Sequence, residues 1–240
     1  YRSVTFSDIN ILNPAFAVDP NITDEDGFTA DIGFRGNYKN IISYDLGAFA
    51  LFYNGRIGFI QKAFDDGRVI SERGNVGDAR IFGIESLVDF NLKKILKMNN
   101  DFSLNYFVNT SFISSEYTAS QQSGVEGNEV EFVPNVNIKT GLRFGYKNLM
   151  ANVQYSYLAS QFTDATNSQE SNLSGVIGAI PDYDIMDVSL SYTYKRFKLE
   201  TGINNLLDET YFTRRATGYP GPGIIPSAPR NFYATLQIKL

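Results

Sequence analysis

Apolar and polar residues alternate along much of this chain, which has 240 residues. The last stretch is the clearest example, because Phe232, Leu236 and Ile238 share one face while Thr235 and Gln237 share the other. A period of two residues indicates a β-strand with one apolar and one polar face. The pattern predicts about nine such strands. They are expected at residues 28–35, 44–52, 82–92, 102–112, 136–146, 149–157, 186–194, 197–203 and 231–240.

The connections between these strands alternate between short and long. The short connections each carry Lys or Arg and cover 36–40, 93–100, 147–148 and 195–196. The long ones are polar and cover 54–78, 114–134, 161–181 and 213–229, and a hairpin extension through 57–60 is an alternative for part of the first. An irregular stretch precedes the first strand at 1–27. Strands of about ten residues with this asymmetry are typical of a membrane barrel. The sequence therefore predicts an all-β fold, an antiparallel up-and-down transmembrane β-barrel.

A soluble sandwich or meander also has strands with one apolar face, so alternation alone leaves that alternative open. Two features favour the barrel. The strands exceed the length of about five or six residues that is usual in soluble sheets, and Greek-key sandwiches mix connection lengths at both ends. Aromatic residues near the short turns would form one girdle at a membrane interface. They are Phe34, Tyr44, Phe90, Tyr146, Tyr194 and Phe197.

Two absences in the composition exclude several classes of chemistry. The chain has no cysteine and no histidine, so it cannot build a disulfide, a thiolate or imidazole metal site, or a Ser-His-Asp nucleophile. We therefore expect no metal site, no cofactor and no enzymatic activity. The net charge of -5 disfavours nucleic acid as a partner, because that class of ligand needs a basic surface.

The C-terminal segments GINNLLDETYF and GYPGPGIIPSAPRNFYATLQIKL contain an Asn-Leu-x-Asp element, a Tyr, a loop, and a Pro-Arg pair before the last strand. In these segments the chain resembles TonB-dependent outer-membrane receptors, and among them the ferric citrate type. Upstream, Gly83 and Glu85 resemble the Gly-x-Glu strand entry of that family. The matching C-terminal positions are Asn205, Leu206, Asp208, Tyr211, Pro229 and Arg230.

The resemblance implies that residues 1–240 are the C-terminal part of a barrel of about 22 strands. The plug domain, the box that contacts TonB and the earlier strands would lie upstream. The implied function is active uptake of a ferric chelate, a siderophore or a similar scarce ligand, energised through TonB. The implied partners are outer-membrane lipid and lipopolysaccharide, the TonB complex through the N-terminal part, and a small metal chelate. The long loops would be extracellular and the short turns periplasmic.

Arginine and aromatic side chains in the long loops are the candidates for binding an anionic chelate. Arg214, Arg215 and Tyr219 lie in the last long loop, and Arg68 and Arg73 lie in the first one after residue 27. Guanidinium groups suit carboxylate ligands, although most loop charges are simply solvated. Charged residues expected on the lumen face would pack against the plug. They are Glu85, Asp89, Lys139, Arg143 and Glu200.

An acidic cluster near the N-terminus has the oxygen-bearing side chains that calcium prefers. Its spacing does not match an EF-hand loop, so an ordinary charged loop is the simpler interpretation. The cluster consists of Asp19, Asn21, Asp24, Glu25 and Asp26.

Two functional alternatives remain open on the sequence alone. A passive porin-like barrel would have no plug and about 16 to 18 strands. A soluble β-rich adhesion or structural module would be recovered in the aqueous fraction without detergent.

Overall fold

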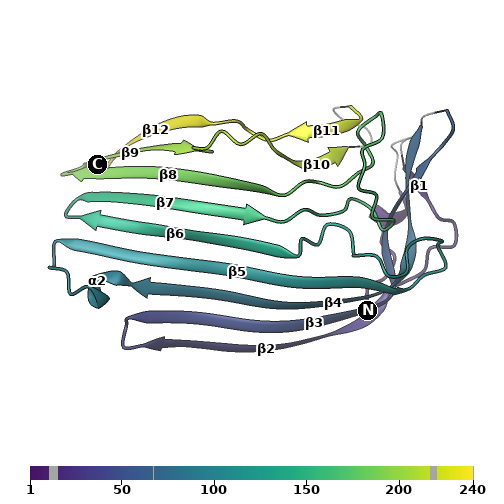
Figure 1. Ribbon diagram of the computed structural model, residues 1–240, viewed down its shortest axis with the longest axis horizontal. Coiled ribbons are helices and arrows are strands. Elements are labelled where there is room, and N and C mark those ends of the chain that lie inside the picture. Colours follow the sequence, from purple (N-terminus) through teal and green to yellow (C-terminus); the bar gives the residue numbers. More distant parts are fainter. Residues whose placement is uncertain (11–15, 67, 217–220, 240) are drawn as a thin grey trace.

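In a computed structural model, which describes residues 1–10, 16–66, 68–216 and 221–239, the chain forms one large curved sheet (Figure 1). Nine strands pair antiparallel in the order in which they occur along the chain, with β9 pairing to β12. The prediction of nine antiparallel strands is confirmed, and as far as the described residues go β2 and β12 form the two edges of a partial barrel. The strands are β2 (Asp26–Tyr38), β3 (Ile42–Ala63), β4 (Val69–Asn91), β5 (Phe102–Ala119), β6 (Val136–Tyr146), β7 (Leu149–Leu158), β8 (Tyr183–Tyr194), β9 (Phe197–Asn204) and β12 (Asn231–Ile238).

The short connections all lie at one end of the sheet, which we call the turn end, and the long connections lie at the opposite loop end (Figure 1). Two of the short connections are tight hairpins, in which Lys147 and Lys195 adopt positive φ angles of 50° and 52°. A third contains the short helix α2 (Leu92–Ile95). The described helices have four residues each and are too short and too polar to cross a membrane.

One face of the sheet is apolar across all nine strands, because the register aligns the apolar residues of each strand with those of the next. Ala50 lies between Ala30 and Phe82, and Val153 lies between Leu142 and Val188. The side chains on this apolar face are largely exposed. The predicted girdle lies there, close to the turn end, and its rings pair with neighbours such as Phe34 with Tyr44 (5.4 Å) and Tyr146 with Phe102 (4.7 Å).

The expectation that residues 54–78 are mostly a loop is wrong, because the hairpin extension considered for 57–60 is much longer. β3 continues to Ala63 and β4 begins at Val69, so the two strands pair almost to the tip. We call this extension, residues 56–63 and 69–77, the arm. Gly55 has φ +59° and the β3–β4 register shifts between Tyr53 and Arg56, and these irregularities bend the hairpin. The arm stands at a steep angle to the other strands at the right of Figure 1.

Other predicted loops also contain regular structure. The stretch 1–27 includes helix α1 (Phe6–Ile9) and β1 (Phe16–Val18), which pairs parallel with β4 at 71–73 and covers its edge beyond the end of β5. The predicted loop 114–134 is also wrong at its start, because β5 runs to Ala119. The loop at 213–229 contains a separate two-stranded sheet, β10 (Phe212–Ala216) and β11 (Gly223–Pro226). The stretch 161–181 has no strand, as predicted.

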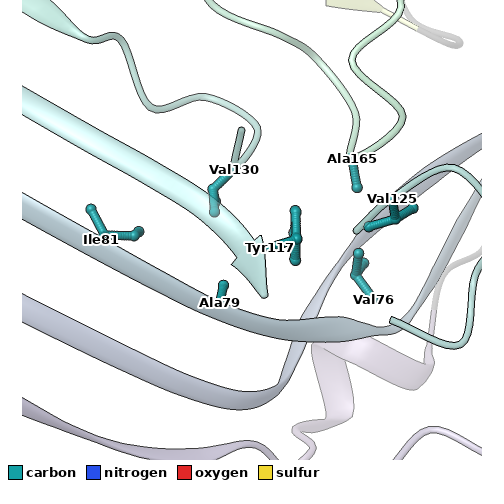
Figure 2. Close-up of a cluster of buried hydrophobic side chains, with 7 residues drawn as sticks. All are labelled: Val76, Ala79, Ile81, Tyr117, Val125, Val130 and Ala165. Atoms are coloured by element: carbon teal, nitrogen blue, oxygen red, sulfur yellow. The ribbon is translucent and has the colours of Figure 1, made fainter. Parts of the chain in front are cut away.

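A hydrophobic core lies at the loop end, on the face opposite to the apolar one (Figure 2). Ala79 and Ile81 of β4 and Tyr117 of β5 point to this side, where residues of the loops 120–135 and 161–182 cover them. Phe49, Leu51 and Tyr53 of β3 also pack against the core, so both faces of β3 are apolar here. The buried members are Val76, Ala79, Ile81, Tyr117, Val125, Val130 and Ala165.

Candidate functional site

The second face of the sheet is polar between the turn end and the core. The charged residues predicted for the lumen lie on this polar face, where Arg143 donates to Asp89 (2.6 Å) and Asn105 donates to the same carboxylate (3.0 Å). A pocket of about 580 Å³ hollows the middle of the face. Its charged lining residues are Arg35, Asp45 and Glu85, and Arg35 pairs with Asp45 (2.7 Å).

A buried polar cluster stands beside the core at the loop end. One guanidinium nitrogen of Arg56 donates to Glu131 (2.5 Å) and to the hydroxyl of Tyr117 (2.6 Å), and that hydroxyl donates to Glu131 (2.7 Å). Burial raises the pKa of Tyr117, and the nearby Glu131 carboxylate raises it further. For Arg56, burial alone would lower the pKa, but the attraction of Glu131 outweighs it and the pKa is raised. The cluster is therefore a fixed ion pair with a neutral tyrosine.

Hydrogen bonds join the loops 120–135 and 161–182 to each other. Asn167 donates to the carbonyl of Glu129 (2.9 Å) and accepts from its N–H (2.7 Å). Asn128 donates to the carbonyl of Ala165 (2.8 Å), and the N–H of Phe132 donates to the carbonyl of Phe162 (2.9 Å). Because the two loops also share the hydrophobic core, they form one packed layer over the polar face.

Two of the predicted ligand-binding arginines are engaged with groups of their own chain. Arg215 donates to the carbonyls of Gly175 (2.6 Å) and Ala179 (2.7 Å), and burial lowers its pKa. Arg73 donates to Asp8 (2.8 Å) and its guanidinium lies 4.6 Å from the ring centre of Phe59. These arginines tie the β10–β11 hairpin to the loop 161–182 and the N-terminal segment to the arm.

The other candidates are placed differently. Arg68 is exposed at the tip of the arm and pairs with Asp66 (2.6 Å). Arg214 is exposed on β10, on a different side of the strand from Arg215. Tyr219 lies outside the described residues. The structure therefore brings Arg214 and Arg215 to one hairpin, while Arg68 and Arg73 lie on the arm.

The residues of the C-terminal motif close the base of the last long connection. The amide of Asn205, 3% exposed, donates to the carbonyl of Glu209 (2.8 Å) and accepts from its N–H (2.8 Å). Asp208 accepts from the N–H of Arg230 (3.1 Å) and pairs with its guanidinium (3.1 Å). The ring of Tyr211 lies 4.6 Å from that of Tyr183.

Two further motif positions act through their backbone. The N–H of Leu206 donates to the carbonyl of Met186 on β8 (2.6 Å), and the carbonyl of Pro229 accepts from Asn231 (3.0 Å). Together the motif residues direct the chain out of β9 and back into β12.

The acidic residues near the N-terminus accept hydrogen bonds from the protein itself. Asp24 accepts from the N–H of Val4 (2.7 Å), and Glu25 accepts from the N–H of Ile57 (2.6 Å). Within the described ranges, no group of three or more acidic side chains is arranged to hold a metal ion. The carboxylates instead fix the N-terminal segment against the bend of the arm.

Sequence reasoning did not find the buried cluster of Arg56, Tyr117 and Glu131. Arg56 and Glu131 fall in stretches that were predicted to be loops, and they are 75 residues apart in the sequence. One signal was present: the run Phe49–Tyr53 is apolar at nearly every position, which indicates a strand that is covered on both faces.

Comparison with solved structures shows the same fold in much larger proteins. The unliganded ferric citrate transporter FecA superposes with a TM-score of 0.73 at 20% identity, over 90% of this chain and 31% of that one. The copper transporter OprC gives 0.72 at 14% identity, over 99% and 36%. The ferric yersiniabactin uptake receptor FyuA from Yersinia pestis gives 0.66 at 17% identity, over 90% and 30%. The chain spans about a third of the length of these proteins.

The family comparison covers most of the chain. The family model described as TonB dependent receptor-like, beta-barrel, matches residues 1–206. This range includes the strands β2 to β9, the arm and the core at the loop end. The C-terminal motif closes the same meander, and the strand order is that of an up-and-down barrel wall. The chain belongs to the TonB-dependent receptor β-barrel family.

Proposed function

We propose that the chain is the C-terminal part of an outer-membrane receptor that takes up a scarce ligand, a ferric chelate or siderophore or a similar molecule, with energy supplied through TonB. The family match carries this proposal. The continuous apolar face supports a place in lipid, because strands that cross a membrane expose one apolar face to it. The loop end is then extracellular and the polar face lines the lumen.

The packed layer at the loop end supports a receptor more than a passive pore. In a passive pore the loops need only leave a water-filled path. Here the loops 120–135 and 161–182 fold inward onto the polar face and bury a core there. Loops that pack inward in this way suit a receptor that binds a ligand and opens on demand. The passive porin-like barrel is the alternative, and it predicts uptake without an energy source.

We assign first contact with an anionic chelate to the exposed arginines of the loop end. Arg214 on β10 and Arg68 at the tip of the arm carry guanidinium groups that suit carboxylate or catecholate oxygens. Arg215 and Arg73 support these two segments through their contacts with Ala179 and Asp8.

Uptake by the full-length receptor tests the proposal. Cells that lack their own iron receptors, with and without TonB, would express the receptor and be given radioactive iron as ferric citrate, a ferric catecholate or a ferric hydroxamate. We expect at least one chelate to accumulate only when both the receptor and TonB are present. Accumulation that is independent of TonB would favour the porin-like alternative. Recovery of the receptor without detergent would contradict the membrane location.

A further inference from the structure

A buried carboxylate stands where the arm meets the loop 161–182. Asp164 is 1% exposed, and its Oδ2 accepts from the hydroxyl of Thr166 (2.9 Å). The backbone N–H groups of Gln61, on the arm, and of Ser168 face the same carboxylate. Its Oδ1 is buried and has no hydrogen-bond partner among the described residues. An unsatisfied buried oxygen of this kind is uncommon and costs free energy, so it calls for a physical explanation.

The surroundings of Asp164 disfavour its negative charge. Burial raises its pKa, and the Glu131 carboxylate adds to the effect, against hydrogen bonds from Thr166, Ser168 and the N–H of Gln61. Glu131, from the loop 120–135, is the titratable group that acts on Asp164, and it is itself bonded to Arg56 of β3 and Tyr117 of β5. Arg56 is already paired with Glu131, and no basic side chain in the described part of the chain pairs with Asp164. The cluster is electrically balanced when Asp164 carries a proton.

We propose that Asp164 is a proton-dependent latch, which keeps the loop 161–182 packed against the loop 120–135 while it is protonated and loosens that contact when it is ionised. Deprotonation would place a second negative charge beside Glu131 in a buried site, where charge repulsion is poorly screened. In the closed state the two loops are packed together, and in the open state they are apart. The closed state binds the proton more tightly than the open state does. The closed state is therefore favoured at low pH and loses stability as the pH rises above the ordinary aspartate value of 3.8.

The geometry shows which parts would separate. Ala165 follows the latch directly and is 0% exposed in the core, where it lies close to Val76 of the arm and Val125 of the loop 120–135 (Figure 2). Release of Asp164 would let the loops 120–135 and 161–182 part and would expose the side chain at position 125.

Thiol labelling of the full-length receptor tests the latch without any ligand. Val125→Cys places a thiol in the core, in a chain that has no cysteine of its own; cysteines elsewhere in the receptor would be replaced by serine. Its reaction with a membrane-impermeant maleimide is measured in outer-membrane vesicles from about pH 4 to pH 8. Ser171→Cys, exposed in the loop 161–182, corrects for the ionisation of the thiol. The corrected rate is expected to rise with pH. The total rise should be about tenfold for each unit by which the pKa of Asp164 in the closed state exceeds that in the open state.

Three variants make the outcome decisive. Asp164→Asn keeps the carboxamide neutral, so the rise should disappear. Asp182→Asn changes an exposed carboxylate at the end of the same connection and should leave the rise intact. If Asp164→Asn does not pack, Thr166→Val decides, because loss of the hydroxyl that donates to Asp164 should move the rise to higher pH. A rise that persists unchanged in Asp164→Asn or in Thr166→Val, or no rise in the unmodified receptor, would overturn the latch. None of these results depends on TonB or on a chelate, so failure of the latch leaves the uptake proposal standing.

Discussion

Ile81 and Ile84 lie three residues apart on β4 and have opposite surroundings. Ile81 is 8% exposed in the core at the loop end, whereas Ile84 is 63% exposed on the apolar face. Within the protein, Ile81 is stabilised by packing against the loops, while Ile84 has only its neighbours in the sheet. The difference shows that the two faces of one strand have different surroundings. One face of β4 packs under the loops as in a water-soluble protein, and the other exposes its apolar residues on the side that we propose to meet lipid.

The same contrast appears in the polar groups. At the loop end, Glu131 and Arg56 form an enclosed ion pair beside Tyr117. On the apolar face, hydroxyl groups are satisfied locally, as where Ser86 meets Thr110 (2.7 Å) and Thr201 donates to the carbonyl of Tyr233 (2.9 Å). A polar group without water must find a partner nearby. The polar groups of the apolar face find partners within the sheet, and those of the loop end find partners between loops.

The largest effect is expected from breaking the buried ion pair. Glu131→Ala leaves Arg56 enclosed without its partner, which should destabilise the loop end by about 3–5 kcal/mol. Hydrogen exchange of the loop 120–135 should increase while that of β6 and β7 does not. Glu116→Ala, which removes the exposed pair with Arg80, is the control and should cost at most about 1 kcal/mol. Equal effects from the two variants would show that the loop end is not a separate packed unit.

A second test uses the two isoleucines themselves. Ile81→Ala should lower the free energy of unfolding of the loop end by about 2–4 kcal/mol, because it leaves a cavity in the core. Ile84→Ala removes a side chain that makes few protein contacts, so it should cost less than about 1 kcal/mol in the same measurement. Hydrogen exchange of β4 and β5 amides in detergent micelles provides both values. A reversed order would contradict the division of β4 into two environments.

The C-terminal motif offers a smaller effect. Asn205→Ala removes an amide that satisfies two backbone groups of Glu209, and it should destabilise the β9–β12 connection by about 1–3 kcal/mol. Asn204→Ala, next to it but exposed, is the matched control. Proteolysis of the connection 205–230 in the folded receptor measures the difference. Identical cleavage of the two variants would remove the structural role assigned to the motif.

The smallest effect concerns the N-terminal segment at low pH. Burial alone would raise the pKa of Asp8, but hydrogen bonds from Thr5, Arg73 and Arg2 outweigh it, so the pKa is well below the ordinary value. A depressed pKa means that Asp8 stabilises the fold above the ordinary value of 3.8 and loses this contribution as the pH falls toward the folded value. Segment 1–25 should therefore detach from the arm in strong acid, as measured by proteolysis with an acid-stable protease.

Asp8→Asn should detach the segment already at neutral pH. Asp66→Asn, at the exposed tip of the arm, is the control and should have no effect on the N-terminal segment. Detachment of segment 1–25 at the same pH in Asp8→Asn and in the unmodified chain would show that Asp8 does not hold it.

The sequence by itself determined the nine strands of the large sheet and their order. A two-residue period fixes which side chains share a face, and short basic turns force antiparallel neighbours, so periodicity alone places residues such as Leu142, Val153 and Val188 on one face of adjacent strands. The C-terminal positions Asn205 and Asp208 were also recognisable, because a turn needs particular residue types at particular places.

The tertiary structure alone decided the loop end. Arg56 and Glu131 come together only when the arm bends and two loops fold inward, and no local pattern encodes a contact across 75 residues. The role of Arg215 was hidden for the same reason, because its partners are carbonyl groups, which every residue carries. Periodicity shows which side chains of a strand share a face, whereas the packed layer of loops that covers one of those faces is created by the fold.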